Sequence, residues 1–595
     1  MVHRIGIDFG TTNSLISVVT REGLIKSFDE SGRPHPSVVR YEGEQIICGR
    51  KAREQLDTPG IGVLGNTVRG PKKLLGQEHV SVDGRVMSPV NIITDFMEHL
   101  VKQAKASDED NVADFTRAVV TIPVALDGRG RQDLREALLQ ADILVDSFVH
   151  EPLAALYGYF KDLENTNDAL SFYEGRMVLV FDWGGGTLDL TLCKIVNGSL
   201  VQVLNRGNNN VGGDYLDDAI LHHVIEKHAA RFAWTAETKL STNPGMRAKL
   251  LAQCERAKIV LSTRDKTHIF MPDFFQSDDE DEAEIDVWLT REELESICSK
   301  IINQGINEID TLLASDQANV DPQTLALCLA TGGMVNMPLI KSRLTEIFGV
   351  STLHVSEKGD RIISEGAAWI ANDNLHLALA KPFELVEARN SLLTIIPEGT
   401  RLPSRGRQIQ SSQAMYCSDP RDGKAIFIFK RPQMVQKSAA ADPRTTYRSL
   451  VVQINPHFPP LSERIELTVT IDENLIARVR AMANDRKVPA ETEIYDLEFS
   501  LVVNPSTSDP SQKKKRLKVH VDRDRPNELV VMSNVTNDSE RWETVPGDLL
   551  KAHNDKHVYL RKPMTTLQQE EYVRYQPCSN CGASWSSRCC QGALT

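Results

Sequence analysis

The stretch Ile5–Val19, IGIDFGTTNSLISVV, is an apolar run interrupted by Asp8 and by a tight turn at Gly10–Thr12. A second stretch, Val178–Leu192, has the same form in VLVFDWGGGTLDLTL: an apolar strand, an aspartate, a glycine-rich turn with a threonine, and another apolar strand. Glycine in each turn lets backbone N–H groups approach an anion closely. The pair therefore predicts a duplicated α/β core in which two β-hairpins grip a polyphosphate from opposite sides.

Each turn is preceded by an aspartate, Asp8 in the first hairpin and Asp182 in the second. Carboxylate oxygens suit a hydrated Mg²⁺, so both aspartates are candidate metal ligands that act through water. The alternative is that the glycines only make tight hairpins and the aspartates only form turns. Two in-strand aspartates would be costly to bury without a cation, which favours the metal. The P-loop pattern G-x-x-x-x-G-K-[ST] is absent from the sequence.

Length and charge narrow the class of protein. The chain has 595 residues, too many for one hydrophobic core, and should form several domains. Its net charge of −13 argues against a nucleic-acid-binding surface over the whole molecule. No apolar segment reaches the roughly 18 residues that span a bilayer, and the N-terminus lacks the form of a signal peptide. We therefore expect a cytoplasmic protein without nucleic-acid or membrane partners.

The pattern of strands and helices divides the chain into four segments. Residues 1–372 alternate strand-like and helical runs, which predicts an α/β nucleotide-binding domain. Residues 373–380 are interpreted as a linker. Residues 381–503 hold short β-type runs separated by turn residues, which predicts an all-β sandwich. Residues 504–595 form a C-terminal extension whose fold the sequence does not determine.

Eight stretches along the chain read IGIDFGTTNS, GPKKLLG, AVVTIPVAL, HEPLAALYGY, VFDWGGGTLDL, VGGDYLDDA, CERAKIVLS and LATGGMVNMP. In this order and spacing they resemble the seventy-kilodalton heat-shock chaperones of the DnaK type, from Arg4 to about Val503. The resemblance implies an actin/hexokinase-like duplicated core followed by a β-sandwich that binds substrate. It also implies ATP hydrolysis, with ATP/ADP and Mg²⁺ as cofactors and K⁺ as a further candidate ion.

The resemblance implies a role for each matched position. Lys72 would neutralise charge on the γ-phosphate and position the attacking water, and Glu151 would orient that water or the metal shell. Taken alone, Lys72 would more often be a solvated lysine and Glu151 a helix-start carboxylate. The residues expected to act in hydrolysis are Lys72, Glu151, Asp182 and Thr187, with Asp189 nearby. The phosphates would be cradled by Gly10, Thr11, Thr12, Gly184, Gly185 and Gly186.

The adenosine site is similar to the family's only in part. It would lie among Gly212, Gly213, Glu255, Lys258, Ser262, Gly332 and Gly333. The family usually has an arginine at the position of Ile259, and Ser-x-Arg where Met334 and Asn336 stand, so affinity and exchange rate should differ. Pro123 and Arg131 match the family's proposed relay between ATP and the second domain.

The second domain resembles the family's peptide-binding sandwich, which holds an extended apolar peptide by main-chain hydrogen bonds and one deep pocket. The cleft candidates are Leu392, Ile426 and Ile428, and the alternative for each is an ordinary core residue. A proline-rich, β-leaning segment replaces the family's helical lid. Leu379 stands where the linker normally has an aspartate, and Ser147 where an arginine engages J-domain co-chaperones. Both changes argue against ordinary J-domain stimulation, whereas a nucleotide-exchange factor stays a candidate partner.

The C-terminus carries a group of four cysteines in CSNCGASWSSRCC. Cys578, Cys581, Cys589 and Cys590 supply enough thiolates for a tetrahedral Zn²⁺ site. A tail of free thiols is the alternative, because adjacent cysteines seldom bind one metal together.

Taken together, the sequence predicts an ATPase of the chaperone family, in which ATP hydrolysis controls the binding and release of unfolded polypeptide segments. Two alternatives stay open: a nucleotide-switched scaffold related to actin, and a small-molecule kinase on the same nucleotide core.

Overall fold

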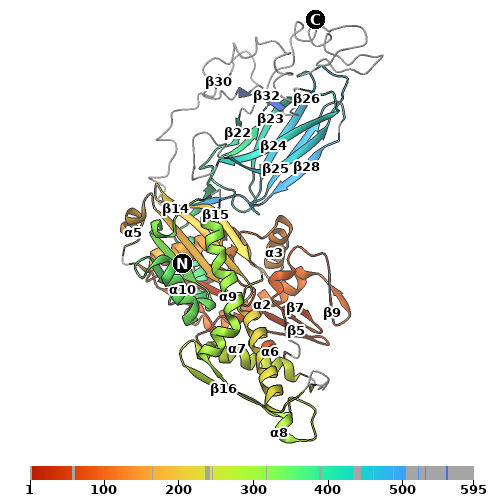
Figure 1. The fold of residues 1–595 in the computed structure, drawn as a ribbon. Coiled ribbons are helices and arrows are strands. Elements are labelled where there is room, and N and C mark those ends of the chain that lie inside the picture. Colours follow the sequence, from red (N-terminus) through yellow and green to blue (C-terminus); the bar gives the residue numbers. More distant parts are fainter. Residues whose placement is uncertain are drawn as a thin grey trace, which may run out of the picture. The chain divides into compact units, whose positions relative to one another are not determined.

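The computed structural model describes residues 3–56, 60–163, 165–208, 210–234, 242–243, 245–315, 318–387, 392–417, 419–432, 444–459, 461–486 and 488–503, with three short strands further on, β30 (His520–Val521), β31 (Leu529–Val530) and β32 (Val558–Leu560). These residues form two units (Figure 1). The first unit contains residues 1–377 and also Ser500–Asn504, and the second contains Ala378–Phe499.

The first hairpin is the centre of a six-stranded sheet with the strand order β12-β11-β1-β2-β3, in which β4 also pairs with β2. β1 runs antiparallel to β2 and parallel to β11. Ile5, Ile7 and Phe9 on one face of β1 are fully buried, and Gly6 and Asp8 on the other face are buried as well, as expected for a strand covered on both faces. The strands are β1 (His3–Phe9), β2 (Asn13–Val19), β3 (Ile25–Phe28), β4 (His35–Pro36), β11 (Ala113–Ile122) and β12 (Leu144–His150).

The second hairpin is the centre of a seven-stranded sheet with the order β19-β18-β13-β14-β15-β29-β20. β13 runs antiparallel to β14 and parallel to β18, which repeats the pattern of the first sheet. This repeat confirms the predicted duplicated α/β core. The strands are β13 (Met177–Trp183), β14 (Leu188–Val196), β15 (Ser199–Asn208), β18 (Leu327–Thr331), β19 (Leu353–Val355), β20 (His376–Leu379) and β29 (Phe499–Val502).

Helices cover the two sheets. The two helices α4 and α11 pack closely, because a Cβ added at Gly158 would lie 2.8 Å from the carbonyl oxygen of Ile362. The helices are α1 (Arg50–Glu54), α2 (Pro89–Ser107), α3 (Gly128–Gln140), α4 (Glu151–Asp162), α5 (Thr166–Tyr173), α6 (Gly213–Arg231), α7 (Met246–Leu261), α8 (Glu280–Ala283), α9 (Arg291–Leu313), α10 (Pro338–Phe348) and α11 (Ile362–Asn372).

Smaller elements complete the first unit. A four-stranded sheet has the order β6-β5-β8-β7, the strands β9 and β10 pair with each other, and so do β16 and β17. Short 3-10 helices include η1 (Pro71–Leu74) and η3 (Gly333–Asn336). The strands are β5 (Val38–Glu42), β6 (Gln45–Cys48), β7 (Gly62–Leu64), β8 (Thr67–Arg69), β9 (Val80–Val82), β10 (Arg85–Met87), β16 (Lys266–Met271) and β17 (Ile285–Thr290).

The second unit consists of two antiparallel sheets, ordered β22-β21-β24-β25 and β28-β27-β26-β23-β32. Buried and less buried residues alternate along β24 and β27, as the predicted sandwich requires, and Phe427 and Val479 belong to the buried face. The strands are β21 (Phe383–Val386), β22 (Leu392–Ile396), β23 (Ile409–Cys417), β24 (Lys424–Pro432), β25 (Arg444–Gln453), β26 (Arg464–Ile471), β27 (Ala477–Ala483) and β28 (Ala490–Ile494).

Two predictions fall outside the described residues. One is the replacement of the family's lid, and the other is the group of four cysteines at 578, 581, 589 and 590. Within the part of the chain that the structure describes, no helix is both long enough and apolar enough to cross a membrane. The three predicted boundaries between the four segments stay predictions.

Candidate functional site

The turns of the two quoted hairpins face each other. A Cβ added at Gly185 would lie 3.2 Å from Cβ of Thr12, and one at Gly186 would lie 3.3 Å from Cγ2 of Thr11. Glycine is therefore required for the close approach of the two turns. Oγ1 of Thr12 is buried, and it has no hydrogen-bond partner among the described residues. A buried hydroxyl without a partner between two glycine turns fits a phosphate oxygen or a cation.

The two aspartates occupy equivalent places in the two sheets. Asp8 of β1 pairs with Leu15 of β2 and Thr121 of β11. Asp182 of β13 pairs with Asp189 of β14 and Thr331 of β18. The threonines were missed by sequence reasoning, although Thr331 is the last residue of β18 and Thr121 is the last but one of β11. Thr121 donates a hydrogen bond from Oγ1 to Oδ1 of Asp8 over 3.0 Å, and this bond fixes the direction of the carboxylate.

Lys72 and Glu151 form a buried ion pair close to Asp8. Nζ of Lys72, in η1, donates to Oε1 of Glu151, the first residue of α4, over 2.6 Å. Burial alone would lower the pKa of Lys72, but the negative charges of Glu151 and Asp8 outweigh burial and raise it. The lysine therefore stays positively charged at neutral pH and can stabilise an anion.

Asp189 completes a group of acidic side chains around that lysine. Burial, and then the charge of Glu151, raises the pKa of Asp189 to about 6. Thr187 donates a hydrogen bond to Oδ2 of Asp189 over 3.1 Å. Asp8, Glu151 and Asp189 thus place more negative than positive charge around Lys72. This donor set fits Mg²⁺, because a hydrated divalent cation would relieve the repulsion among the carboxylates.

The predicted adenosine residues lie together only in part. Gly213, at the start of α6, accepts a hydrogen bond from Nζ of Lys258 over 2.9 Å, and Lys258 also pairs with Asp217 at 2.7 Å. A Cβ added at Gly213 would lie 2.7 Å from Sδ of Met334, so this departure from the family pattern lies inside the site. Gly212 packs on the backbone of the Gly185–Gly186 turn, and Gly332 lies against Asp182.

The remaining predicted residues of this region lie less centrally. Ser262 follows α7 and donates to the carbonyl of Lys258 over 3.2 Å. Ile259 is 51% exposed, and Asn336 donates to the carbonyl of Gly333 over 3.2 Å. Gly333 has open space where a Cβ would lie. Ile259 therefore offers no planar group that could stack on the base, as the arginine of the family does.

Three basic residues near the site were missed by sequence reasoning. Arg53 pairs with Glu255, and Arg69 pairs with Asp214 at 2.7 Å. Nζ of Lys73 reaches to 3.7 Å from a Cβ position at Gly186. For Arg69 and Lys73 the signal available in the sequence was the run of charges in RGPKK, together with the acidic residues of GGDYLDD.

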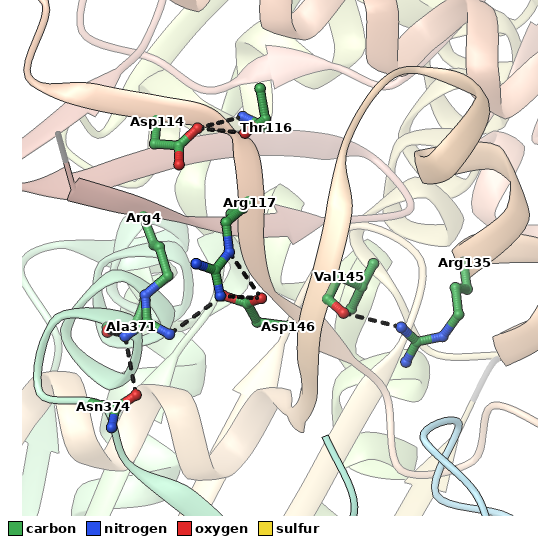
Figure 2. A network of polar contacts seen from close by, with 9 residues as sticks. All are labelled: Arg4, Asp114, Thr116, Arg117, Arg135, Val145, Asp146, Ala371 and Asn374. Carbon is green, nitrogen blue, oxygen red and sulfur yellow. Dashed lines mark hydrogen bonds and ion pairs between the residues drawn. The ribbon is translucent and has the colours of Figure 1, made fainter. Parts of the chain in front are cut away.

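Two further groups of contacts involve Arg131, one of the predicted relay residues, and Asp146, which precedes Ser147. Arg131 is fully buried and donates from Nε to the carbonyl of Leu126 over 2.8 Å, which ties down the loop after Pro123. Figure 2 shows Arg4 and Arg117 both directed at Asp146, with N–O distances of 3.3 and 2.8 Å.

Arg4 also reaches the end of the first unit's last helix. It donates to the carbonyl oxygen of Ala371 in α11 and to Oδ1 of Asn374, so it caps this helix just before the linker (Figure 2). Ser147, the residue at the family's J-domain arginine position, directly follows Asp146 and pairs with Val119.

In the second unit, two of the three cleft candidates lie in one row of the sheet. Val386 of β21 pairs with Leu392 of β22 on one side and with Ile428 of β24 on the other. Directly opposed residues share a face, and Ile426 lies two positions along on that same face. All three candidates are half-buried, whereas Phe427 between them is fully buried.

A family sequence model and two individual relatives all place this chain in the same family. A sequence model of the family described as "Hsp70 protein" matches residues 4–573. The chain is similar to the chaperone protein DnaK of Ureaplasma urealyticum serovar 10, with 26% identity over 92% of this chain and 88% of the relative. It is also similar to the chaperone protein DnaK of Ureaplasma parvum serovar 3, with 27% identity over 91% of this chain and 87% of the relative. The chain therefore belongs to the Hsp70 family, as a distant relative of DnaK.

Proposed function

We propose that this protein is an ATP-dependent molecular chaperone. Its first unit hydrolyses ATP to ADP and phosphate, and its second unit binds and releases extended polypeptide segments. The observation that carries the proposal is the buried Lys72–Glu151 pair beside Asp8 and Asp189, close to two glycine turns that contact each other. Hsp70 proteins as a family bind ATP with Mg²⁺ and bind polypeptide substrates, which supports the same conclusion.

Each part of the first unit's site has a task in phosphoryl transfer to water. The amides of the Gly10–Thr12 and Gly184–Gly186 turns bind the phosphate oxygens, and the hydroxyl of Thr12 donates to one of them. Asp8 and Asp182 would hold Mg²⁺ through water, and the ion would supply positive charge against the phosphoryl oxygens. Lys72 stabilises the negative charge on the γ-phosphate, and Glu151 accepts a hydrogen bond from the attacking water and so orients it.

The second unit supports peptide binding through an apolar row in which the half-buried side chains of Leu392 and Ile428 flank the buried Val386. Leu392, Val386 and Ile428 lie side by side across three strands, and Ile426 extends the row. An extended peptide would place an apolar side chain on this row and form main-chain hydrogen bonds to the strands beside it.

The test is the rate of ATP hydrolysis with and without a permanently unfolded polypeptide. We expect slow hydrolysis that the polypeptide accelerates, and we expect Lys72→Met to slow single-turnover hydrolysis by about 10²–10³-fold while ATP still binds. Lys102→Met, at an exposed position of α2, is the matched control and should hydrolyse ATP at the normal rate.

Two other outcomes would favour the alternatives. A phosphorylated acceptor in place of free phosphate would indicate a small-molecule kinase. Filaments that form on addition of ATP, without affinity for peptide, would indicate a nucleotide-switched scaffold related to actin.

A further inference from the structure

A short strand from late in the sequence lies on the β-sandwich of the second unit. β32 runs antiparallel to the end of β23, so that Val558–Leu560 is opposed to Met415–Cys417 and Tyr559 faces Tyr416. β26 pairs with the other side of β23, and β32 is therefore the edge strand of this five-stranded sheet. The backbone groups that β32 covers are those through which the edge of a sheet pairs with another extended chain.

The same strand also contacts the other sheet of the sandwich. β32 lies against β24, the strand that carries the cleft candidates Ile426 and Ile428. The end of β23 and the start of β24 lie together, because Sγ of Cys417 donates to the carbonyl oxygen of Lys424 over 3.8 Å. β32 is thus held where the two sheets meet, next to the strand that supplies two of the three cleft candidates.

The burial of β23 changes where β32 pairs with it. Residues two positions apart share one face of a strand, so Gln410, Ser412 and Tyr416 lie on the same face. Gln410 and Ser412 are exposed, and so is Arg464, the partner of Tyr416 on β26, whereas Tyr416 is only 5% exposed. A large side chain on an otherwise open face is buried only where further residues cover it. This burial agrees with a chain segment held at this end of β23.

The segment has the chemistry of the peptides that the second unit is proposed to bind. Addition of a strand to a sheet edge is one way to bind an extended peptide, in which main-chain hydrogen bonds supply affinity and apolar pockets select side chains. Val558–Leu560 reads VYL, an apolar triplet, and it lies against the strand of Ile426 and Ile428. Because it belongs to the same chain, it acts at an effective concentration on the order of millimolar.

We propose that Val558–Leu560 is an internal competitor for peptide. It occupies the edge of the sandwich in the resting protein, and an extended polypeptide binds only when β32 leaves β23. A segment that is bound in about nine of ten molecules lowers the apparent affinity for peptide about tenfold. A ladder of three opposed residue pairs is small enough to open without unfolding the sandwich. The inference rests on the proposed function, because it requires that the second unit binds peptides.

Two acidic substitutions in the full-length protein test the competitor. Val558→Asp with Leu560→Asp places two carboxylates in the segment, which should then leave the apolar site. We expect a labelled extended apolar peptide to bind this variant about tenfold more tightly than the parent protein, as measured by fluorescence anisotropy. Leu529→Asp with Val530→Asp is the matched control and should bind peptide as the parent does, because β31 pairs with β30 and not with the sandwich.

A reversible crosslink gives the opposite change. Cys417 is a free thiol directly opposed to Val558, at the Cα separation that a disulfide needs. Val558→Cys, with the four C-terminal cysteines changed to serine, should form a disulfide with Cys417 on oxidation. The oxidised protein should bind peptide at least about tenfold more weakly than its reduced form. Leu560→Cys is the matched control, since it lies opposite Met415, and its peptide affinity should not depend on oxidation.

Three results would overturn the competitor: unchanged peptide affinity in the acidic variant, no disulfide between Cys417 and the introduced thiol, or equal affinity of the oxidised and reduced proteins. Any of them, when the parent protein binds peptide, refutes the competitor and leaves the proposed function standing. Absence of peptide binding in the parent and in the acidic variant alike refutes the proposed function of the second unit instead.

Discussion

Arg69 and Asp214 lie 145 residues apart in the sequence and form an ion pair in which Nη2 is 2.7 Å from Oδ1. Arg69 ends β8 in the small four-stranded sheet, and Asp214 stands in the first turn of α6, next to Gly213 of the predicted adenosine site. A second pair, Arg53 of α1 with Glu255 of α7, joins the same two regions. Both pairs must separate if these regions move apart to release nucleotide.

We predict that Arg69→Met accelerates ADP release about tenfold, which corresponds to about 1.4 kcal/mol. A partly buried pair is worth more than an exposed one, and its loss leaves Asp214 without its cation. Stopped-flow release of fluorescent ADP measures the rate. Arg117→Met, which removes a more exposed pair with Asp146, is the control and should release ADP at the normal rate. Equal rates for the two variants would show that the Arg69 pair does not hold the nucleotide.

The threonine beside Asp8 gives a prediction about the metal. Thr121→Val removes the hydroxyl that donates to Asp8 but keeps the shape of the side chain. Removal of a hydrogen bond to a metal-binding side chain typically lowers the affinity for the metal by about 10–100-fold. We therefore expect the Mg²⁺ concentration for half-maximal ATP hydrolysis to rise about tenfold, with a smaller change at saturating Mg²⁺.

The control for this change is Thr191→Val, which removes a hydroxyl of similar burial whose partner, Asn205, lies in β15. That variant should need no more Mg²⁺ than the parent protein. An unchanged Mg²⁺ requirement in Thr121→Val would mean that the hydrogen bond from Thr121 does not orient Asp8 toward the metal.

The apolar row of the second unit gives a prediction about peptide binding. Ile428→Asp puts a carboxylate where an apolar peptide side chain would lie, so affinity for an extended apolar peptide should fall at least tenfold. Met482→Asp, a half-buried position of β27 in the other sheet, is the matched control. Fluorescence anisotropy of a labelled peptide measures both. If both variants bind equally well, the peptide lies elsewhere.

The parts of the fold that the sequence predicted are those with local signals. The hairpins around Asp8 and Asp182 each lie within about fifteen consecutive residues, where apolar strands and a glycine turn leave few other arrangements. The contact between Thr121 and Asp8 depends on pairing between strands more than 100 residues apart, and no local pattern encodes that register.

The pairing of β15 with β29 shows the same limit more strongly. Phe499–Val502 reads as one more strand of the sandwich, because an apolar run of four residues carries no information about which sheet it joins. Ion pairs such as Arg69 with Asp214 were likewise not predicted from the sequence, because isolated charged residues are usually exposed to solvent. Local patterns therefore predicted the two hairpins well and the contacts between distant segments poorly.

The buried histidine beside Glu151 gives a prediction about pH. The pKa of His150 is about 3 in the folded protein, because burial and then Arg131 disfavour the charged ring, while the unfolded chain titrates near 6.5. The neutral ring therefore contributes stability that is fully present above pH 6.5 and is lost as the pH falls from there toward 3. The loss reaches about 2 kcal/mol at pH 5, at about 1.4 kcal/mol per pH unit.

A comparison with His150→Gln isolates this contribution, because glutamine does not titrate and every other histidine is shared by the two proteins. Denaturant unfolding, followed by tryptophan fluorescence to which the fully buried Trp183 of the first unit contributes, gives the free energy of unfolding at pH 8 and at pH 5. We expect the parent protein's stability to fall by about 2 kcal/mol more than the variant's between these two pH values. Parallel losses in both proteins would mean that the His150 ring is not held neutral, and that its bond to Gln202 is weaker than the 2.9 Å distance indicates.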